Sequence, residues 1–126
     1  MRRSTILTAA SLLSIVLLLL HFTDDIVYGS DKSAIANVIS VAVLVIWLYG
    51  TLVLADRRSG YVIMLLGSVA GLVVFAVHEG RTGGLSAGPL AASSGAFFFT
   101  WTLLTLAVSS VFTAVLSVLC LAAPDS

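Results

Sequence analysis

Four long apolar stretches, separated by short polar connections, dominate the pattern of this chain. They cover residues 6–22, 34–55, 61–77 and 96–123. A helix needs about 20 apolar residues, with roughly 17 to 25 tolerated, to cross the hydrocarbon core of a bilayer. All four stretches approach or exceed that length. The pattern therefore predicts four transmembrane helices.

The connections between these stretches indicate how the helices are arranged. We expect helices over about residues 4–28, 34–55, 60–79 and 94–122. Short connections make consecutive helices antiparallel neighbours. The sequence thus predicts an all-α membrane protein, an up-down-up-down bundle of four transmembrane helices. We expect residues 1–126 to form a single integral membrane domain.

Composition agrees with a chain that lies almost entirely in a membrane. The chain is 60% hydrophobic and 10% charged, and its mean hydropathy is +1.16. The formal net charge is zero and no basic cluster is present, which argues against nucleic acid as a partner and leaves the lipid bilayer. Cys120 is the single cysteine, so an intrachain disulfide and a CxxC motif are excluded.

The distribution of basic residues predicts the orientation of the helices. Lys and Arg collect in cytoplasmic segments. The N-terminus and the second connection carry Arg2, Arg3, Arg57 and Arg58, whereas the first and third connections carry only Lys32 and Arg81. We therefore expect a multi-pass plasma-membrane protein with both termini in the cytoplasm.

The first apolar stretch also has features of a cleaved signal peptide, because two arginines precede it. A signal peptide needs small residues at a cleavage site just after the apolar run. Residues 21–25 read His-Phe-Thr-Asp-Asp instead. We expect this segment to be retained as the first transmembrane helix.

Ionisable residues are rare in this chain, and several gather where apolar stretches end. His21, Asp24, Asp25 and Tyr28 are spaced i, i+3, i+4 and i+7, which places them on one side of a helix. His21 and Asp25 also share a face with Ser11 and Ser14, small residues that suit helix packing. This face is expected to point into the bundle.

A second polar group, His78 and Glu79, ends the third apolar stretch. His78 is nearly in phase with Gly67 and Gly71, so it is expected to face inward as well. From residue 3 to His21 and from residue 60 to His78 the helix rise is the same, roughly 27 Å. The two histidines are thus predicted at one depth, near the outer boundary of the membrane.

We call this predicted site the His/Asp cup and define it by His21, Asp25 and His78. Ionisable groups near the apolar zone are costly, and those that face inward are functional by default. The competing interpretation is that they are solvated ends of membrane spans. Secondary candidates are Asp24 and Glu79, and further candidates for the lining are Tyr28, Asn37 and Arg81.

Four kinds of chemistry fit such a cup. Imidazole nitrogen with carboxylate oxygen suits a divalent metal such as zinc, iron or manganese. A b-haem between two histidines is disfavoured by the nearby carboxylates. His–Asp pairing can also serve proton-linked transport or acid–base catalysis on a lipid-like substrate. The last alternative is an interhelical hydrogen bond that sets the helix register. A Ser/His/Asp hydrolase lacks a nucleophile-elbow motif here.

The length and four-span layout resemble the small multidrug transporters. Their defining feature is a glutamate embedded in the first helix, whereas the centre of that helix here is residues 12–17, Leu-Leu-Ser-Ile-Val-Leu. Glu79, the only glutamate, ends the third stretch. Four-helix quinone reductases of the vitamin K type need cysteine pairs, which this sequence lacks. Neither family's function is carried over.

Other polar and aromatic residues are expected to pack the bundle or anchor it. A stripe along the fourth helix is expected to face the bundle, and Trp47 is expected to anchor the inner interface. A phenylalanine triplet at the start of the fourth helix is expected at the outer interface, or as the wall of an apolar pocket. The stripe is Thr102, Thr105, Ser109, Thr113 and Ser117, and the triplet is Phe97, Phe98 and Phe99.

We therefore expect a small polytopic membrane protein, a candidate subunit of a homo-oligomer or larger complex, whose outer cup binds a metal ion or small ligand. The alternatives are a membrane enzyme that uses the cup on a lipid-soluble substrate and, less favoured, an oligomeric transporter. An enzyme requires an apolar cavity that opens laterally beneath the cup. A binding or structural protein requires a cup filled by its own side chains.

Overall fold

The computed structural model describes residues 2–27, 33–82 and 94–123. Four helices make up this part of the chain: α1 (Arg3–Val27), α2 (Ala34–Leu52), α3 (Arg58–Thr82) and α4 (Ser94–Ala122). Each is long and apolar enough to cross a membrane. A helix satisfies its backbone hydrogen bonds internally, which hydrocarbon surroundings require. The predicted all-α fold of four membrane-spanning helices is confirmed.

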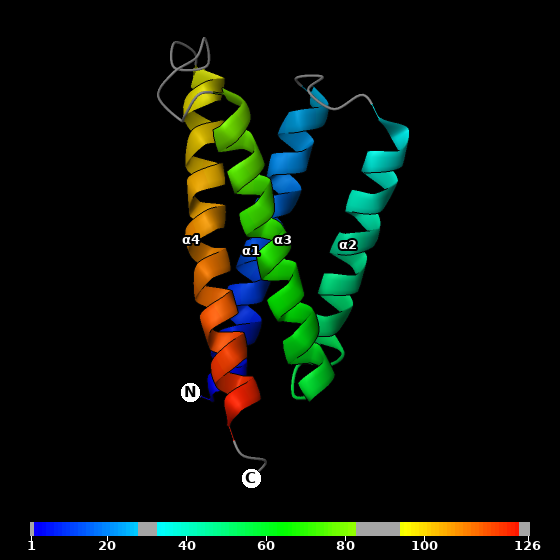
Figure 1. Cartoon of the computed structure of the whole chain (residues 1–126), viewed down its shortest axis with the longest axis vertical. Coiled ribbons are helices and arrows are strands. Elements are labelled where there is room, and N and C mark those ends of the chain that lie inside the picture. Colours follow the sequence, from blue (N-terminus) through cyan, green and yellow to red (C-terminus); the bar gives the residue numbers. More distant parts are fainter. Residues whose placement is uncertain (1, 28–32, 83–93, 124–126) are drawn as a thin grey trace.

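The four helices form an antiparallel bundle in which α4 is the main packing partner. α4 packs extensively on both α1 and α3, whereas α2 packs on α3 and, less, on α1. Within the described ranges, α2 does not contact α4. Figure 1 shows α2 to one side of the other helices, with the start of α1 and the end of α4 at the same end of the bundle. This is the predicted up-down-up-down order.

The C-terminal ends of α2 and α3 differ most from the prediction. α2 ends at Leu52 rather than residue 55, and a turn follows in which the N–H of Arg57 donates to the carbonyl of Leu54 at 2.9 Å. The chain turns within an apolar run, so hydrophobicity could not place the turn. α3 continues past residue 79 to Thr82, because a single glycine costs a helix only about 1 kcal/mol.

Buried hydroxyl groups join α1 to α2. Ser11 is fully buried, and its Oγ lies 2.8 Å from Oγ1 of Thr51. The indole N–H of Trp47 donates to the same Ser11 oxygen at 2.9 Å. The prediction of Trp47 as an interface anchor is wrong, since its side chain is 1% exposed. The hydrogen bond to Ser11 satisfies the indole N–H, so the ring can lie in the core.

A second set of hydroxyl groups joins α1 to α4. Ser14 of α1 is fully buried and lies 3.0 Å from Oγ of Ser109 and 3.3 Å from Oγ1 of Thr113. Most of the predicted stripe on α4 is buried, but Thr105 is exposed. Thr105 donates to the carbonyl of Trp101 on its own helix, which satisfies a hydroxyl group that faces away from the bundle.

Gly67 and Gly71 of α3 allow close packing on two different neighbours. A Cβ atom at Gly67 would lie 2.2 Å from the Trp47 ring of α2. At Gly71 it would lie 2.6 Å from Oγ of Ser110 on α4. α3 therefore approaches α2 and α4 through separate glycines, as expected where small residues set helix distances in lipid.

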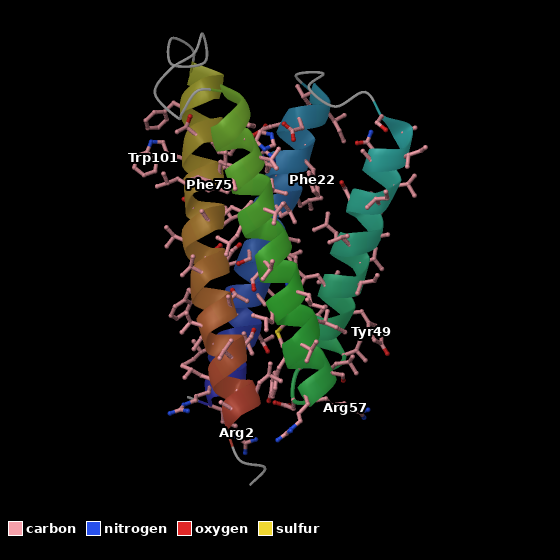
Figure 2. All side chains as sticks on the ribbon, viewed as in Figure 1. Arg2, Phe22, Tyr49, Arg57, Phe75 and Trp101 are labelled. Carbon is pink, nitrogen blue, oxygen red and sulfur yellow. The ribbon has the colours of Figure 1, made fainter. Side chains whose placement is uncertain are left out.

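The outer surface of the bundle is apolar over most of its height. Large apolar side chains of all four helices are exposed, among them Leu13, Val45, Leu66 and Phe112. Arg2 and Arg57 lie at the end of the bundle opposite Trp101 (Figure 2). An apolar belt between polar ends is the surface expected of a chain that crosses a bilayer.

Candidate functional site

The three residues of the His/Asp cup come together between α1 and α3. Nε2 of His21 lies 3.1 Å from Oδ2 of Asp25, one turn further along α1. Nε2 of His78, on α3, lies 3.6 Å from the same oxygen. The two imidazole rings meet edge to face, with centroids 4.5 Å apart. These three residues, which equal depth and helical phase predicted to meet, are therefore in contact.

Packing holds the His21 ring in a fixed position. His21 is fully buried, whereas the side chains of Asp25 and His78 are 14% and 26% exposed. The ring of Phe99 on α4 lies 5.2 Å from that of His21 and 5.9 Å from that of His78, between centroids. One member of the phenylalanine triplet thus forms an apolar wall beside the cup. Phe97 and Phe98 are exposed.

A backbone contact sets the tautomer of His78. Its Nδ1 lies 2.9 Å from the carbonyl oxygen of Val74, one turn earlier on α3. A carbonyl oxygen only accepts hydrogen bonds, so Nδ1 carries the hydrogen and donates it. In a neutral ring, Nε2 then presents its lone pair toward Asp25. In this neutral form two lone pairs face each other across 3.6 Å, an arrangement that a cation between them would stabilise, whereas in the protonated ring Nε2–H donates to Asp25.

His21 is held differently from His78. Nδ1 of His21 has no hydrogen-bond partner among the described residues, whereas Nε2 lies 3.1 Å from Oδ2 of Asp25. A buried polar atom without a partner carries a desolvation cost. A metal ion bound to Nε2 would satisfy that nitrogen without a hydrogen bond.

The geometry of the cup suits a metal ion. His21, Asp25 and His78 each offer one ligand atom, and these atoms lie within 4.8 Å of one another. Metal–ligand bonds to nitrogen and oxygen are about 2.0–2.2 Å for zinc, so small side-chain shifts suffice to close such a set. A b-haem does not fit this arrangement, because the two rings touch and leave no room for a macrocycle.

The other candidate residues differ in their position with respect to the cup. Asp24 is partly buried, and its Oδ2 has no hydrogen-bond partner within the described ranges. Asn37 lies in the first turn of α2, and its amide makes no hydrogen bond to the cup in the described part of the chain. Tyr28 and the side chains of Glu79 and Arg81 lie outside the described residues.

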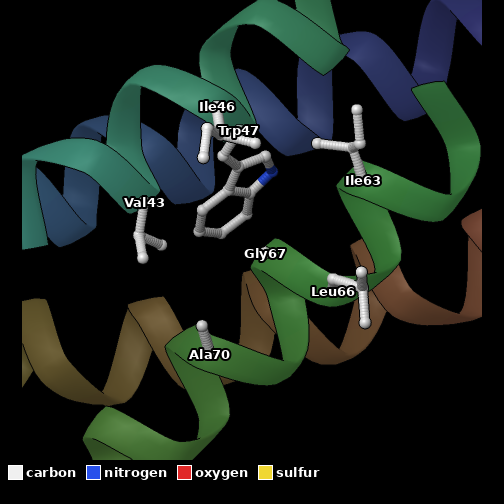
Figure 3. Close-up of a pocket in the computed structure, with 7 residues that line it drawn as sticks. All are labelled: Val43, Ile46, Trp47, Ile63, Leu66, Gly67 and Ala70. Atoms are coloured by element: carbon white, nitrogen blue, oxygen red, sulfur yellow. The ribbon is translucent and has the colours of Figure 1, made fainter. Parts of the chain in front are cut away.

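An apolar pocket lies between α2 and α3, at a distance from the cup. Its volume is 240 Å³, and Trp47, Gly67 and Ala70 are among the residues that line it. Figure 3 shows the indole of Trp47 beside Gly67. From Ala70 to His78 the helix rises roughly 12 Å. This pocket therefore does not open directly beneath the His/Asp cup.

Comparisons with protein-family models, curated protein sequences and solved structures find no match to this chain.

Proposed function

We propose that this protein is a small multi-pass protein of the plasma membrane that binds a divalent transition-metal ion in its His/Asp cup. His21, Asp25 and His78 would be the ligands, and zinc, iron and manganese are the metals that suit two imidazole nitrogens and one carboxylate. The observation that carries the proposal is the convergence of three ligand atoms within 4.8 Å, one from a fully buried histidine.

The hydrogen bond between His78 and Val74 supports this proposal. Histidines that bind metals almost always donate their second ring N–H to a carbonyl, carboxylate or water, which fixes the tautomer and the ring orientation. The donation from His78 Nδ1 to Val74 is of this kind. It leaves Nε2, the nitrogen nearest Asp25, for the metal.

The helix ends provide a second, electrostatic support. The cup lies near the C-terminal ends of α1 and α3, which end at Val27 and Thr82. The C-terminus of a helix carries a partial negative charge of about half an elementary charge. Two such ends and the Asp25 carboxylate together favour a cation at this position.

The close contacts among the described side chains of the cup favour ion binding over catalysis on a lipid-soluble substrate. His21 is fully buried beneath His78 and Phe99, and the pocket beside Trp47 lies well away from it. We infer a binding role, with the metal joining α1 to α3, within a homo-oligomer or a larger membrane complex. The predicted orientation, with both termini cytoplasmic, places the cup on the outer side of the membrane.

Metal analysis of the purified protein tests the proposal. The protein is isolated in detergent with a tag free of histidine, loaded separately with Zn²⁺, Fe²⁺ and Mn²⁺, and analysed by mass spectrometry. We expect one equivalent of at least one metal in the wild type and loss of binding in His21→Ala and His78→Ala. Asn37→Ala is the matched control, because it removes a polar side chain from the same end of the bundle and should retain the metal.

A thermal measurement on the same samples separates specific from adventitious binding. A metal that binds only the folded state, supplied at 100 times its dissociation constant, stabilises the protein by about 2.7 kcal/mol. The wild type and Asn37→Ala should show a rise in melting temperature that both histidine variants lack. The proposal is wrong if no metal binds the wild type, or if the histidine variants bind it equally.

A further inference from the structure

One carboxylate oxygen of Asp24 is buried and needs a hydrogen-bond donor or a positive charge nearby. Its Oδ2 is shielded from solvent and, among the described residues, has no hydrogen-bond partner. A carboxylate oxygen placed in this way is costly unless a proton donor or a positive charge lies nearby. Asp24 directly precedes the candidate ligand Asp25 and follows His21 by one helical turn. The metal proposed for the cup would supply the missing positive charge.

Charge balance gives Asp24 a role in that site. Two neutral imidazoles and the Asp25 carboxylate around a divalent ion leave one positive charge. The partial negative charges of the two helix ends compensate it only in part, because their effect falls off within the last turn of each helix. A net charge in a largely desolvated site carries a high cost, and a second carboxylate close to the ion removes it. With Asp24 ionised, the loaded site is electrically neutral.

The described part of the bundle offers few other groups for this purpose. At this level α4 presents Phe99, which is uncharged, and the ionisable residue of α4 is Cys120 near its other end. The ionisable residue of α2 is Tyr49, which is also remote from the cup. Glu79 and Arg81 of α3 have side chains outside the described residues. Asp24 is the remaining described carboxylate at this end.

The unpartnered nitrogen of His21 points to the same residue. If Nε2 of His21 binds the metal, Nδ1–H needs an acceptor, and among the described residues it has none. Residues spaced i and i+3 are neighbours on a helix surface. Asp24 stands in that relation to His21 and holds an acceptor that lacks a donor.

We propose that Asp24 is the charge-compensating residue of the metal site: it does not bind the ion, but neutralises it and accepts a hydrogen bond from His21, directly or through one water molecule. This inference rests on the proposed metal-binding function. The negative charge of Asp24 would then be the reason why the cup prefers a divalent ion.

The test compares Asp24→Asn with the wild type in two measurements. Asparagine keeps the shape and one acceptor oxygen but removes the charge. We expect the affinity for Zn²⁺, measured by competition with a chelator, to fall roughly 10–100-fold, as is typical when a group that supports metal ligands is lost. The absorption bands of bound Co²⁺ should keep their positions, because the ligands stay the same. Asp24→Glu should restore most of the Zn²⁺ affinity.

Controls separate this role from folding and from the metal site itself. Asp56→Asn makes the same change at an exposed carboxylate in another part of the chain and should bind Zn²⁺ as the wild type does. The melting temperature of each metal-free variant checks folding, and Asp24→Ser repeats the test if Asp24→Asn is unstable.

The outcomes are distinguishable. If the wild type binds no metal, the proposed function fails. If the wild type binds and Asp24→Asn binds equally well, the charge-compensating role alone is overturned. A shift of the Co²⁺ bands in Asp24→Asn would show that Asp24 is a ligand, which also overturns it.

Discussion

Oδ2 of Asp25 lies 3.1 Å from Nε2 of His21 and 3.6 Å from Nε2 of His78. One carboxylate oxygen of α1 thus faces an imidazole nitrogen of its own helix and one of α3. Asp25 is the residue through which the two histidines are connected, and it is the anionic member of the candidate ligand set.

Asp25→Asn should therefore weaken metal binding strongly. The substitution removes the anionic ligand but keeps the size of the side chain. We expect the affinity for Zn²⁺ to fall by about 100-fold or more, as measured by competition with a chelator. Asp56→Asn, at an exposed carboxylate, serves as the control. Equal affinities of wild type and Asp25→Asn would remove Asp25 from the ligand set.

Metal binding should weaken as the solution becomes more acidic. Imidazole binds a metal through a nitrogen that carries no proton, so protons compete with the metal for His21 and His78. We expect the Zn²⁺ dissociation constant to be larger at pH 5.5 than at pH 7.5, in titrations on the same detergent-solubilised sample. An affinity that does not change over this range would argue against histidine ligation.

Ser11→Ala should destabilise the contact between α1 and α2. The Ser11 oxygen accepts the indole N–H of Trp47 and lies 2.8 Å from the Thr51 hydroxyl. Interhelical hydrogen bonds in membrane proteins contribute about 0.6 kcal/mol on average and up to about 1.7 kcal/mol. We expect a loss of about 1 kcal/mol, measured as the free energy of unfolding in mixed micelles with increasing sodium dodecyl sulfate.

The control for this change is Thr105→Ala. Thr105 is exposed and donates only to the carbonyl of Trp101 on its own helix. Its replacement should leave the unfolding free energy nearly unchanged. If Ser11→Ala and Thr105→Ala behave alike, the Ser11–Trp47 hydrogen bond does not hold α2 on α1.

Gly67→Ala should disrupt the packing of α3 against α2. The added Cβ would lie 2.2 Å from the Trp47 ring, so the ring or the helix has to move. Overpacking of this kind costs typically about 1–3 kcal/mol, and the same unfolding assay measures it. Ala76→Val adds volume to α3 at an exposed position and should have little effect. Trp47→Leu should reduce the cost of Gly67→Ala if that contact is its cause.

Much of the architecture follows from the sequence because membrane spans are set by the length and apolarity of each stretch. The end of α2 is the exception, since the turn after Leu52 lies within apolar residues that look the same as the helix. Trp47 was also misplaced. A tryptophan near a helix end is usual at an interface. The Ser11 hydroxyl that accepts its indole N–H, and so allows its burial, belongs to another helix.

The candidate site, too, was predicted from the sequence only in part. Helical periodicity alone places His21 and Asp25 on one face, and the equal rise along two antiparallel spans places His78 at their level. Those relations depend only on spacing along the chain, so the sequence by itself determined them. The small residues in phase with the two histidines indicated that these faces point inward. Tertiary structure confirmed that direction and added the wall made by Phe99 and the buried oxygen of Asp24. In lipid, faces toward protein and faces toward acyl chains are both apolar, so only packing between helices distinguishes them.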